Sequence, residues 1–307
     1  MENMIHVEAL TKDYGPVRAV EDLTFTVQPG IVTGFLGPNG AGKSTTMRMI
    51  VGLDAPTSGT ALVDARPYRD LRRPLTVVGS LLDAKAVHPN RTAANHLRWL
   101  AQSNGIPPER VDEVLGLVGL TDVARKKTGG FSLGMGQRLG LAAALLGDPK
   151  ILVLDEPVNG LDPEGIRWVR DLLKALAAEG RTVFISSHLL SEMALTADRL
   201  IVIGRGRLVA DTSTAEFIRE HSASTVVVRS ERLAEFAEHL TRAGLSPVQV
   251  PGPALEVADA TTEQVGSLAF TGGFRLQELS MRQASLEDAF MDSTGAAVQY
   301  HARKAAG

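Results

Sequence analysis

The chain has 307 residues, of which 44% are hydrophobic and 22% are charged, and its formal net charge is −3. These values are typical of a globular protein with one large domain or two ordinary ones. Because there is no cysteine, disulfides and thiolate-bound metals are excluded. The lack of a basic block argues against a dedicated nucleic-acid binder. No apolar run approaches the ~18 residues needed to cross a bilayer, so work at a membrane would require a partner.

Up to about residue 215 the sequence predicts an α/β fold. Alternating hydrophobic residues in IHVEAL and AVEDLTFTVQPG predict a short antiparallel flank. Continuous apolar runs then alternate with helical patterns, and these runs lie at 32–37, 151–157, 182–188 and 200–209. Such runs indicate strands buried on both faces, hence a mostly parallel sheet covered by helices. Residues about 84–147 are mostly helical in pattern and predict a helical subdomain.

A phosphate-binding loop follows the first of these apolar runs. GPNGAGKS, residues 37–44, matches the pattern G-x-x-x-x-G-K-[ST] between a strand and a helix, which makes a glycine turn without a ligand a poor alternative. Its glycines allow backbone N–H groups to wrap around phosphates. Lys43 is expected to reach the β- and γ-phosphates, and Ser44 to supply a hydroxyl to Mg²⁺. The predicted nucleotide-binding residues here are Gly37, Pro38, Asn39, Gly40, Ala41, Gly42, Lys43, Ser44 and Thr45.

A second loop rich in serine and glycine occurs at FSLGMGQRLG, residues 131–140, just before an apolar helical pattern. It contains no acid, no histidine and no metal ligand. Free N–H groups and the helix dipole make such a helix start suitable for an anion. The chain therefore carries a second candidate phosphate contact that has no catalytic group of its own.

Two further strand ends carry polar residues. ILVLDEP places Asp155 where it can bind Mg²⁺, and Glu156 beside it can take a proton from an attacking water. The alternative for this pair is a solvated acidic turn. TVFISSH ends in His188, which is expected to hydrogen-bond a γ-phosphate, because strand ends in such sheets converge on the ligand.

The texture of the sequence changes after about residue 222. Strand and helix patterns follow in the order βαββαβ, which is the ferredoxin-like pattern. This region contains no recognisable chemistry, so a structural or regulatory role is expected. We predict one domain over residues 1–221 and a small α+β accessory domain over residues 222–307.

Together, the phosphate loop, the acidic pair, His188 and the Ser/Gly-rich loop resemble the ATP-binding subunit of ABC transporters, over roughly residues 4–215. The resemblance implies a phosphate-loop ABC ATPase core that uses ATP and Mg²⁺. In that family a loop reading L-S-G-G-Q contacts the ATP held by a second, head-to-tail copy. Here Ser132 and Gly134 would make this contact, and Met135 replaces the terminal glutamine.

The resemblance also assigns roles to individual positions. Glu156 corresponds to the general base and His188 to the switch histidine. Tyr14 matches the aromatic residue that stacks on adenine, although a packing role is the alternative. Asp162 lies in the loop that crosses the dimer interface. Asp83 stands where the family has glutamine, so we expect it to bind Mg²⁺ or the attacking water and either to alter coupling or to slow basal hydrolysis.

One branch of the family is more similar than the others. The stretch FSLGMGQR, the acid at position 83, the C-terminal extension and SLEDAFMDSTG resemble the ATPases of bacterial daunorubicin- and bacitracin-resistance exporters. This implies export of a drug, antibiotic or lipid-like substrate through separate transmembrane permease subunits, at the cytoplasmic face of the membrane and without nucleic acid.

Three alternatives remain open. An importer ATPase shares the same motifs. A soluble ABC ATPase acting on ribosomes or DNA is disfavoured by the single cassette and by the separation of only about ninety residues between Lys43 and Ser132. A regulator that binds ATP without cleaving it is disfavoured because Glu156 and His188 are both present.

Overall fold

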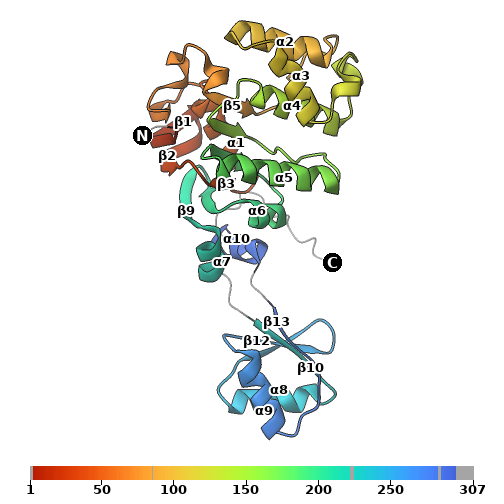
Figure 1. Cartoon of the computed structure of the whole chain (residues 1–307). Coiled ribbons are helices and arrows are strands. Elements are labelled where there is room, and N and C mark those ends of the chain that lie inside the picture. Colours follow the sequence, from red (N-terminus) through yellow and green to blue (C-terminus); the bar gives the residue numbers. More distant parts are fainter. Residues whose placement is uncertain (1–2, 85, 222–224, 283–284, 295–307) are drawn as a thin grey trace, which may run out of the picture. The chain divides into compact units, whose positions relative to one another are not determined.

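The computed structural model describes residues 3–84, 86–221, 225–282 and 285–294 (Figure 1). The chain divides into two compact units, one extending to Thr214 and one running from Ala215 to Ser293. This division falls at the start of helix α7 (Thr214–His221), whereas the domain boundary predicted from the sequence follows the last residue of that helix and stays a prediction. The two units are described separately.

A six-stranded sheet forms the centre of the first unit, in the order β5-β6-β7-β3-β8-β9. The first five strands are parallel and β9 is antiparallel to β8, in agreement with the mostly parallel sheet that we expected. Every residue of β3, β6 and β7 is buried, which explains their continuous apolar sequences. The strands are β3 (Val32–Leu36), β5 (Val78–Leu81), β6 (Ile151–Leu154), β7 (Thr182–Ser186), β8 (Arg199–Gly204) and β9 (Arg207–Ser213).

An antiparallel sheet flanks this one, as predicted, in the order β2-β1-β4, with β1 (Ile5–Tyr14), β2 (Val17–Val27) and β4 (Ser58–Val63). One hydrophobic core joins the two sheets. The rings of Phe25, Phe35 and Phe184 meet there with centroids 5.0–5.8 Å apart. This packing fixes the strand that carries the phosphate loop, because Phe35 is part of β3.

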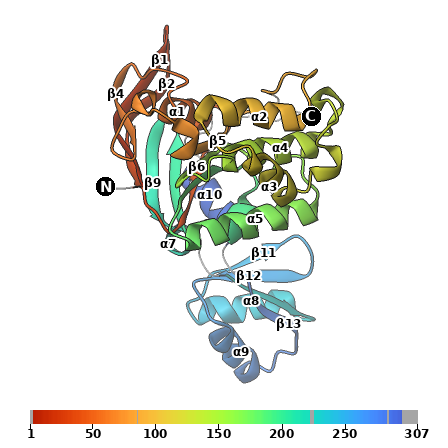
Figure 2. The same cartoon turned by 45° about the horizontal axis from the view of Figure 1, so that its top comes forward.

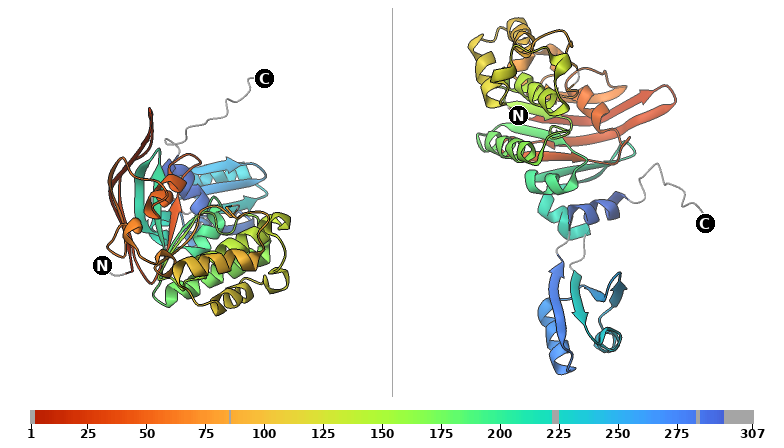
Figure 3. Two further views of the ribbon diagram at one scale, coloured as in Figure 1. Left: turned by 90° about the horizontal axis from the view of Figure 1, so that it is seen from above. Right: turned by 90° about the vertical axis from the view of Figure 1, so that its right-hand side faces the viewer.

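The helices of the first unit fall into two groups. The first group follows strands of the parallel sheet and consists of α1 (Lys43–Ile50), α5 (Pro163–Ala178) and α6 (Leu190–Thr196). The second group lies within residues 84–147 and consists of α2 (Ala93–Asn104), α3 (Glu109–Leu117) and α4 (Leu133–Leu145). Figures 2 and 3 show α2, α3 and α4 packed together. Short 3₁₀ turns lie at η1 (Tyr68–Asp70), η2 (Pro74–Thr76), η3 (Thr121–Val123) and η4 (Thr128–Gly130).

The second unit contains a four-stranded antiparallel sheet in the order β11-β12-β10-β13. Its central elements follow the βαββαβ order, as β10 (Thr225–Ser230), α8 (Leu233–Arg242), β11 (Pro247–Val250), β12 (Ala254–Ala258), α9 (Thr262–Thr271) and β13 (Leu276–Arg282). Helix α10 (Leu286–Thr294) completes the described chain. The core is apolar and centres on Phe236 and Leu240 of α8 packed against Val226 and Val228 of β10. Among the helices described, none combines the length and apolar character required to cross a membrane.

Candidate nucleotide-binding site

The loop from Gly37 to Gly42 connects β3 to α1 and has the backbone shape of a phosphate cradle. Gly40 and Gly42 adopt φ angles of +80° and +104°, which side-chain-bearing residues rarely adopt. A Cβ atom on Gly42 would lie 2.6 Å from the carbonyl oxygen of Ala19, so the close packing here also requires glycine. Helix α1 begins directly afterwards at Lys43. Its first N–H groups have no partner within the helix and are therefore available to an anion.

Lys43 lies within this loop. Its Nζ donates to the carbonyl oxygens of Gly37 (2.6 Å) and Pro38 (3.3 Å). Burial lowers the pKa of Lys43, while the nearby charges of Asp155 and Glu156 act in the opposite direction. The ammonium group therefore lies between the phosphate loop and the acidic pair, where a triphosphate would meet both.

Asp155 is held by two hydroxyl groups at the end of β6. Ser44 Oγ donates to its Oδ2 at 2.6 Å, and the hydroxyl of Ser186 donates to its Oδ1. Hydroxyl and carboxylate oxygens are ligands that Mg²⁺ prefers, so this donor set fits the predicted ion. Within the described part of the chain, no group of three or more His, Asp or Glu side chains could hold a metal by itself. A metal at Ser44 and Asp155 would therefore need phosphate and water oxygens as well.

Glu156 is fixed at its backbone and its side chain. It adopts a φ of +52°, which costs roughly 1–2 kcal/mol for a residue other than glycine. Its N–H donates to Ser186 Oγ at 3.1 Å, and its carbonyl oxygen accepts from Gln137 Nε2 at 2.8 Å. Its carboxylate oxygen Oε2 lies 2.6 Å from Nδ1 of His188. The structure therefore brings together the two residues that we expected to act on the γ-phosphate and its attacking water.

These groups surround one hollow, lined by Ala19, Asn39, Gly40, Gly42, Lys43, Ser44, Thr45, Asp155 and Glu156. Two residues that support it, Ser186 and Gln137, were not predicted from the sequence. The signals were present in each case, because Ser186 is a polar residue that closes an otherwise apolar strand, and Gln137 is a buried amide within an apolar helix. A hydrogen-bond partner distant in sequence cannot be deduced from such a signal.

Tyr14 ends β1 and is 48% exposed, which suits a ring that could stack on a base. Its hydroxyl donates to Asp54 Oδ2 at 3.0 Å, and Asp54 also accepts two hydrogen bonds from Arg48 of α1. Burial raises the pKa of Tyr14 and Asp54 adds to the effect, while Thr45 and Arg48 of α1 oppose it. One face of the Tyr14 ring is also covered, since Lys12 Nζ lies 5.0 Å from the centroid of that ring. Tyr14 is thus anchored beside α1, although it does not line the hollow itself.

Asp83 follows β5, and its side chain is exposed. The N–H of Asp155 donates to the carbonyl oxygen of Leu81 at 2.7 Å, so β5 ends beside the acidic pair. Asp83 therefore lies at the same edge of the parallel sheet as Asp155. This agrees with a position near the γ-phosphate, and its role stays a prediction.

Ser132 and Gly134 do not line the hollow around Lys43. Ser132 caps helix α4 by accepting from the N–H of Met135 at 3.2 Å, and it lines a different hollow. Gly134 packs against the 159–162 loop, where a Cβ atom would lie 3.1 Å from the carbonyl oxygen of Gly160. Asp162 caps α5 by accepting from the N–H of Gly165 at 2.9 Å. Within one chain, the two candidate phosphate loops therefore belong to separate surfaces.

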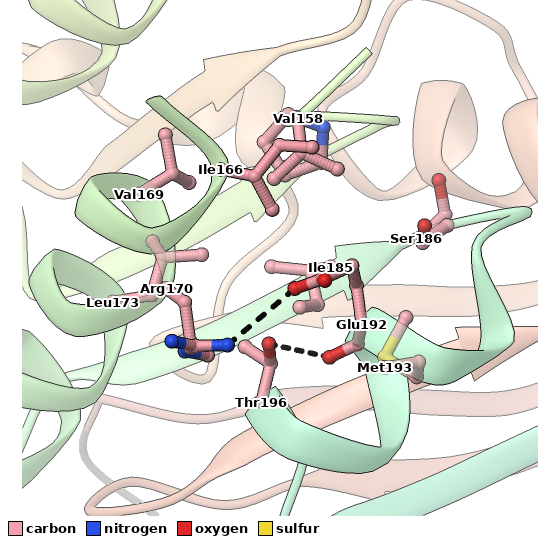
Figure 4. Close-up of a pocket in the computed structure, with 12 residues that line it drawn as sticks. Val158, Ile166, Val169, Arg170, Leu173, Ile185, Ser186, Glu192, Met193 and Thr196 are labelled. Carbon is pink, nitrogen blue, oxygen red and sulfur yellow. Dashed lines mark hydrogen bonds and ion pairs between the residues drawn. The ribbon is translucent and has the colours of Figure 1, made fainter. Parts of the chain in front are cut away.

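A small apolar cavity lies behind Ser186, between α5 and α6 (Figure 4). Arg170 of α5 and Glu192 of α6 form an ion pair there, with Nη1 and Oε2 3.6 Å apart. Thr196 Oγ1 donates to the carbonyl oxygen of Glu192 at 2.7 Å. This pair joins the helix after the acidic loop to the helix after His188.

The fold and the phosphate loop define the class of phosphate-loop ATPases. A family model described as "ABC transporter" matches residues 20–159, and a model described as a domain of unknown function (DUF8746) matches residues 224–287. The uncharacterized ABC transporter ATP-binding protein YhcH of Bacillus subtilis (strain 168) is 38% identical over 298 residues, covering 96% of this chain and 97% of that protein.

Two further relatives agree with this match. The bacitracin transport ATP-binding protein BcrA of Bacillus licheniformis is 44% identical over 214 residues, covering 69% of this chain and 70% of that protein. A solved structure of an ATP-binding subunit of an ABC transporter superposes with a TM-score of 0.65 and 26% identity, covering 71% of this chain and 92% of that one. The chain therefore belongs to the family of ABC transporter ATP-binding proteins, and it is an ATPase.

Proposed function

We propose that this chain is the ATP-hydrolysing subunit of an exporter and works on the cytoplasmic face of a membrane through separate membrane-spanning subunits. A drug, antibiotic or lipid-like compound would be the substrate. The observation that carries this proposal is the separation of two phosphate loops onto different surfaces of one chain, because a second copy is then needed to enclose a nucleotide. The relative named for bacitracin transport supports the substrate class.

ATP would bind with its phosphates against the loop of residues 37–45 and the N-terminus of α1. Lys43 would exchange its contacts with the carbonyl oxygens of Gly37 and Pro38 for phosphate oxygens. Ser44 and Asp155 would hold Mg²⁺, which supplies positive charge beside the phosphate oxygens when it is bound. Asp83 would face the same region from β5.

Glu156 would act as the general base. Its carboxylate takes a proton from the attacking water while the bond between the γ-phosphorus and the leaving oxygen breaks, which yields ADP and phosphate. His188, hydrogen-bonded to Glu156 at 2.6 Å, would orient that carboxylate and contact the γ-phosphate. Fixed donors at these positions lower the barrier by positioning and electrostatics.

The second copy would supply Ser132 and Gly134 to the γ-phosphate, in a head-to-tail dimer with two composite sites. A complementation experiment tests this arrangement directly. Lys43→Ala and Ser132→Ala chains should each hydrolyse ATP much more slowly than the parent as homodimers, but a mixture contains dimers with one intact composite site. The mixture should therefore hydrolyse ATP faster than either variant alone. A mixture no faster than its components would contradict the dimer.

A membrane partner would contact the hollow beside the Ser132 loop. Its lining is largely apolar and consists of Ala84, Val87, Pro89, Thr128, Gly129, Phe131, Ser132, Leu133, Gly136 and Leu139. This hollow follows Asp83 in sequence and borders the start of α4, so movement in it would reach both phosphate contacts. Because the sequence lacks cysteine, Val87→Cys would introduce a unique thiol. We expect that thiol to crosslink to the membrane subunit, whereas a thiol at exposed Gln102 should not.

The direction of transport requires its own measurement. The chain should be reconstituted in vesicles with the membrane subunit encoded beside it, with ATP supplied on the side of the ATPase. Export predicts that substrate moves away from that side, and an importer predicts the reverse.

A further inference from the structure

Gln137 is a buried side chain with a single defined hydrogen bond to the catalytic loop. It lies on α4, five residues after Ser132, and is only 4% exposed. Its Nε2 donates to the carbonyl oxygen of Glu156 at 2.8 Å. Burying an amide costs free energy unless it is paired, so this contact is an important one for the local structure.

The contact acts on a residue whose backbone is unfavourable by itself. Glu156 adopts a φ of +52°, and its N–H is held by Ser186, which is itself bound to Asp155. Those contacts come from Ser186 at the end of β7, the strand beside β6, which carries the acidic pair. Gln137 provides the contact from α4, and it holds the other side of the Glu156 residue, at the carbonyl oxygen.

Helix α4 is held by side-chain contacts both at its start, near Ser132, and beside Gln137. At its start, Ser132 caps the helix by accepting from Met135. Next to Gln137, Arg138 donates to the carbonyl oxygen of Val118 at 3.0 Å and lies over the ring of Trp168 of α5 at 5.2 Å. The helix also packs against β5. A displacement at Ser132 would therefore be passed along a stiff helix to Gln137.

We propose that Gln137 is a positioning residue that links the two nucleotide sites of the dimer. This rests on the proposed function, in which Ser132 and Glu156 of one chain serve different nucleotides. When Ser132 closes on the ATP held by the partner, α4 and Gln137 set the position of Glu156 at the chain's own ATP. Hydrolysis at one site thereby depends on closure at the other.

Gln137→Met tests the positioning role, because methionine keeps the unbranched shape and removes the donor. We expect kcat to fall about tenfold with KM for ATP within about twofold, since the loss of one hydrogen bond affects the base and not the phosphate contacts. Gln137→Leu, which is uncharged and also lacks the donor, should lower kcat in the same way if methionine impairs folding. Gln102→Met, on the exposed face of α2, is the matched control and should keep the parent kcat. A parent-like kcat in both Gln137 variants would overturn the proposal, and so would a fall in kcat matched by an equal loss of ATP affinity.

A double-mutant cycle tests the link between the sites. If α4 carries the signal, Ser132→Ala removes the source and Gln137→Met removes the transmission, so the combined loss in kcat should be smaller than the product of the two single losses. Losses that multiply would refute the link. If instead Ser132→Ala alone leaves hydrolysis unchanged, the proposed dimer fails, which is a different result from a failure of the link.

Discussion

The two units of this chain each combine helices with a β-sheet, but they arrange their polar residues differently. In the first unit, hydrogen bonds connect Ser44, Asp155, Ser186, Glu156 and His188 at the ends of neighbouring strands. In the second, ion pairs lie across the sheet: Arg229–Glu278 connects the neighbouring strands β10 and β13, and Arg282–Glu256 connects β13 to β12, the two strands on either side of β10. In a parallel sheet the carboxyl ends of all strands lie at one edge, whereas in an antiparallel sheet they lie alternately at opposite edges. Strand direction therefore determines where polar side chains can gather into a site.

The strongest test of this difference is Glu156→Gln, which keeps the side-chain shape and removes the base. We expect kcat to fall about a thousandfold, the usual order for loss of a general base, while ATP binding is retained. The ATP-bound dimer should accumulate and can be measured by size-exclusion chromatography with ATP. A variant that hydrolyses ATP at the parent rate would remove Glu156 from its assigned role.

The converse test addresses the second unit, where Phe236 is fully buried. The centroid of its ring lies 4.9 Å from that of Phe274. Phe236→Ala should destabilise that unit by about 3–5 kcal/mol, because it leaves a cavity in a small core. Chemical denaturation would measure this. Hydrolysis by the first unit should remain unchanged if the second unit has a structural role.

The exposed Phe270 of α9 provides the control for this experiment. Phe270→Ala should change the unfolding free energy by no more than about 0.5 kcal/mol. If Phe236→Ala instead changes the ATPase rate, the second unit regulates the first, and the contrast between a chemical and a structural unit is wrong.

Much of the site could be predicted because its residues occur in local patterns. The apolar runs predicted β3, β6 and β7, and the motifs placed Lys43 after the loop that follows β3, Asp155 directly after β6, and His188 two residues after β7. The contacts that join them were not predictable, because each connects side chains distant in sequence. Gln137 and Ser186 were therefore missed, although both hold Glu156. The dimer roles of Ser132 and Asp162 stay predictions, since within one chain both residues act as helix caps.

A third prediction compares two ion pairs of similar exposure, Arg48–Asp54 in the first unit and Arg282–Glu256 in the second. Asp54 also accepts from the hydroxyl of Tyr14, so Asp54→Ala releases the ring expected to stack on adenine. We expect KM for ATP to rise about fivefold, in keeping with the loss of one hydrogen bond, with kcat retained. Glu256→Ala should leave KM unchanged and cost less than about 1 kcal/mol of stability.

Tyr14→Phe separates the hydroxyl from the ring in this comparison. If Asp54 acts through Tyr14, the double variant should be no worse than Asp54→Ala alone. A KM that is unchanged by Asp54→Ala would make its ion pair equivalent to those of the second unit.

The smallest effect is expected at Asp83, an exposed acidic residue at the same edge of the parallel sheet as Asp155. A carboxylate placed near the γ-phosphate would repel the nucleotide, and water screens most of that repulsion at an exposed position. Asp83→Gln should therefore raise basal hydrolysis by only about threefold, corresponding to less than 1 kcal/mol. The increase should shrink as salt is added, because screening already weakens the repulsion. If neither hydrolysis nor transport changes, Asp83 lies outside the field of the nucleotide, and the polar cluster at this sheet edge ends at Asp155.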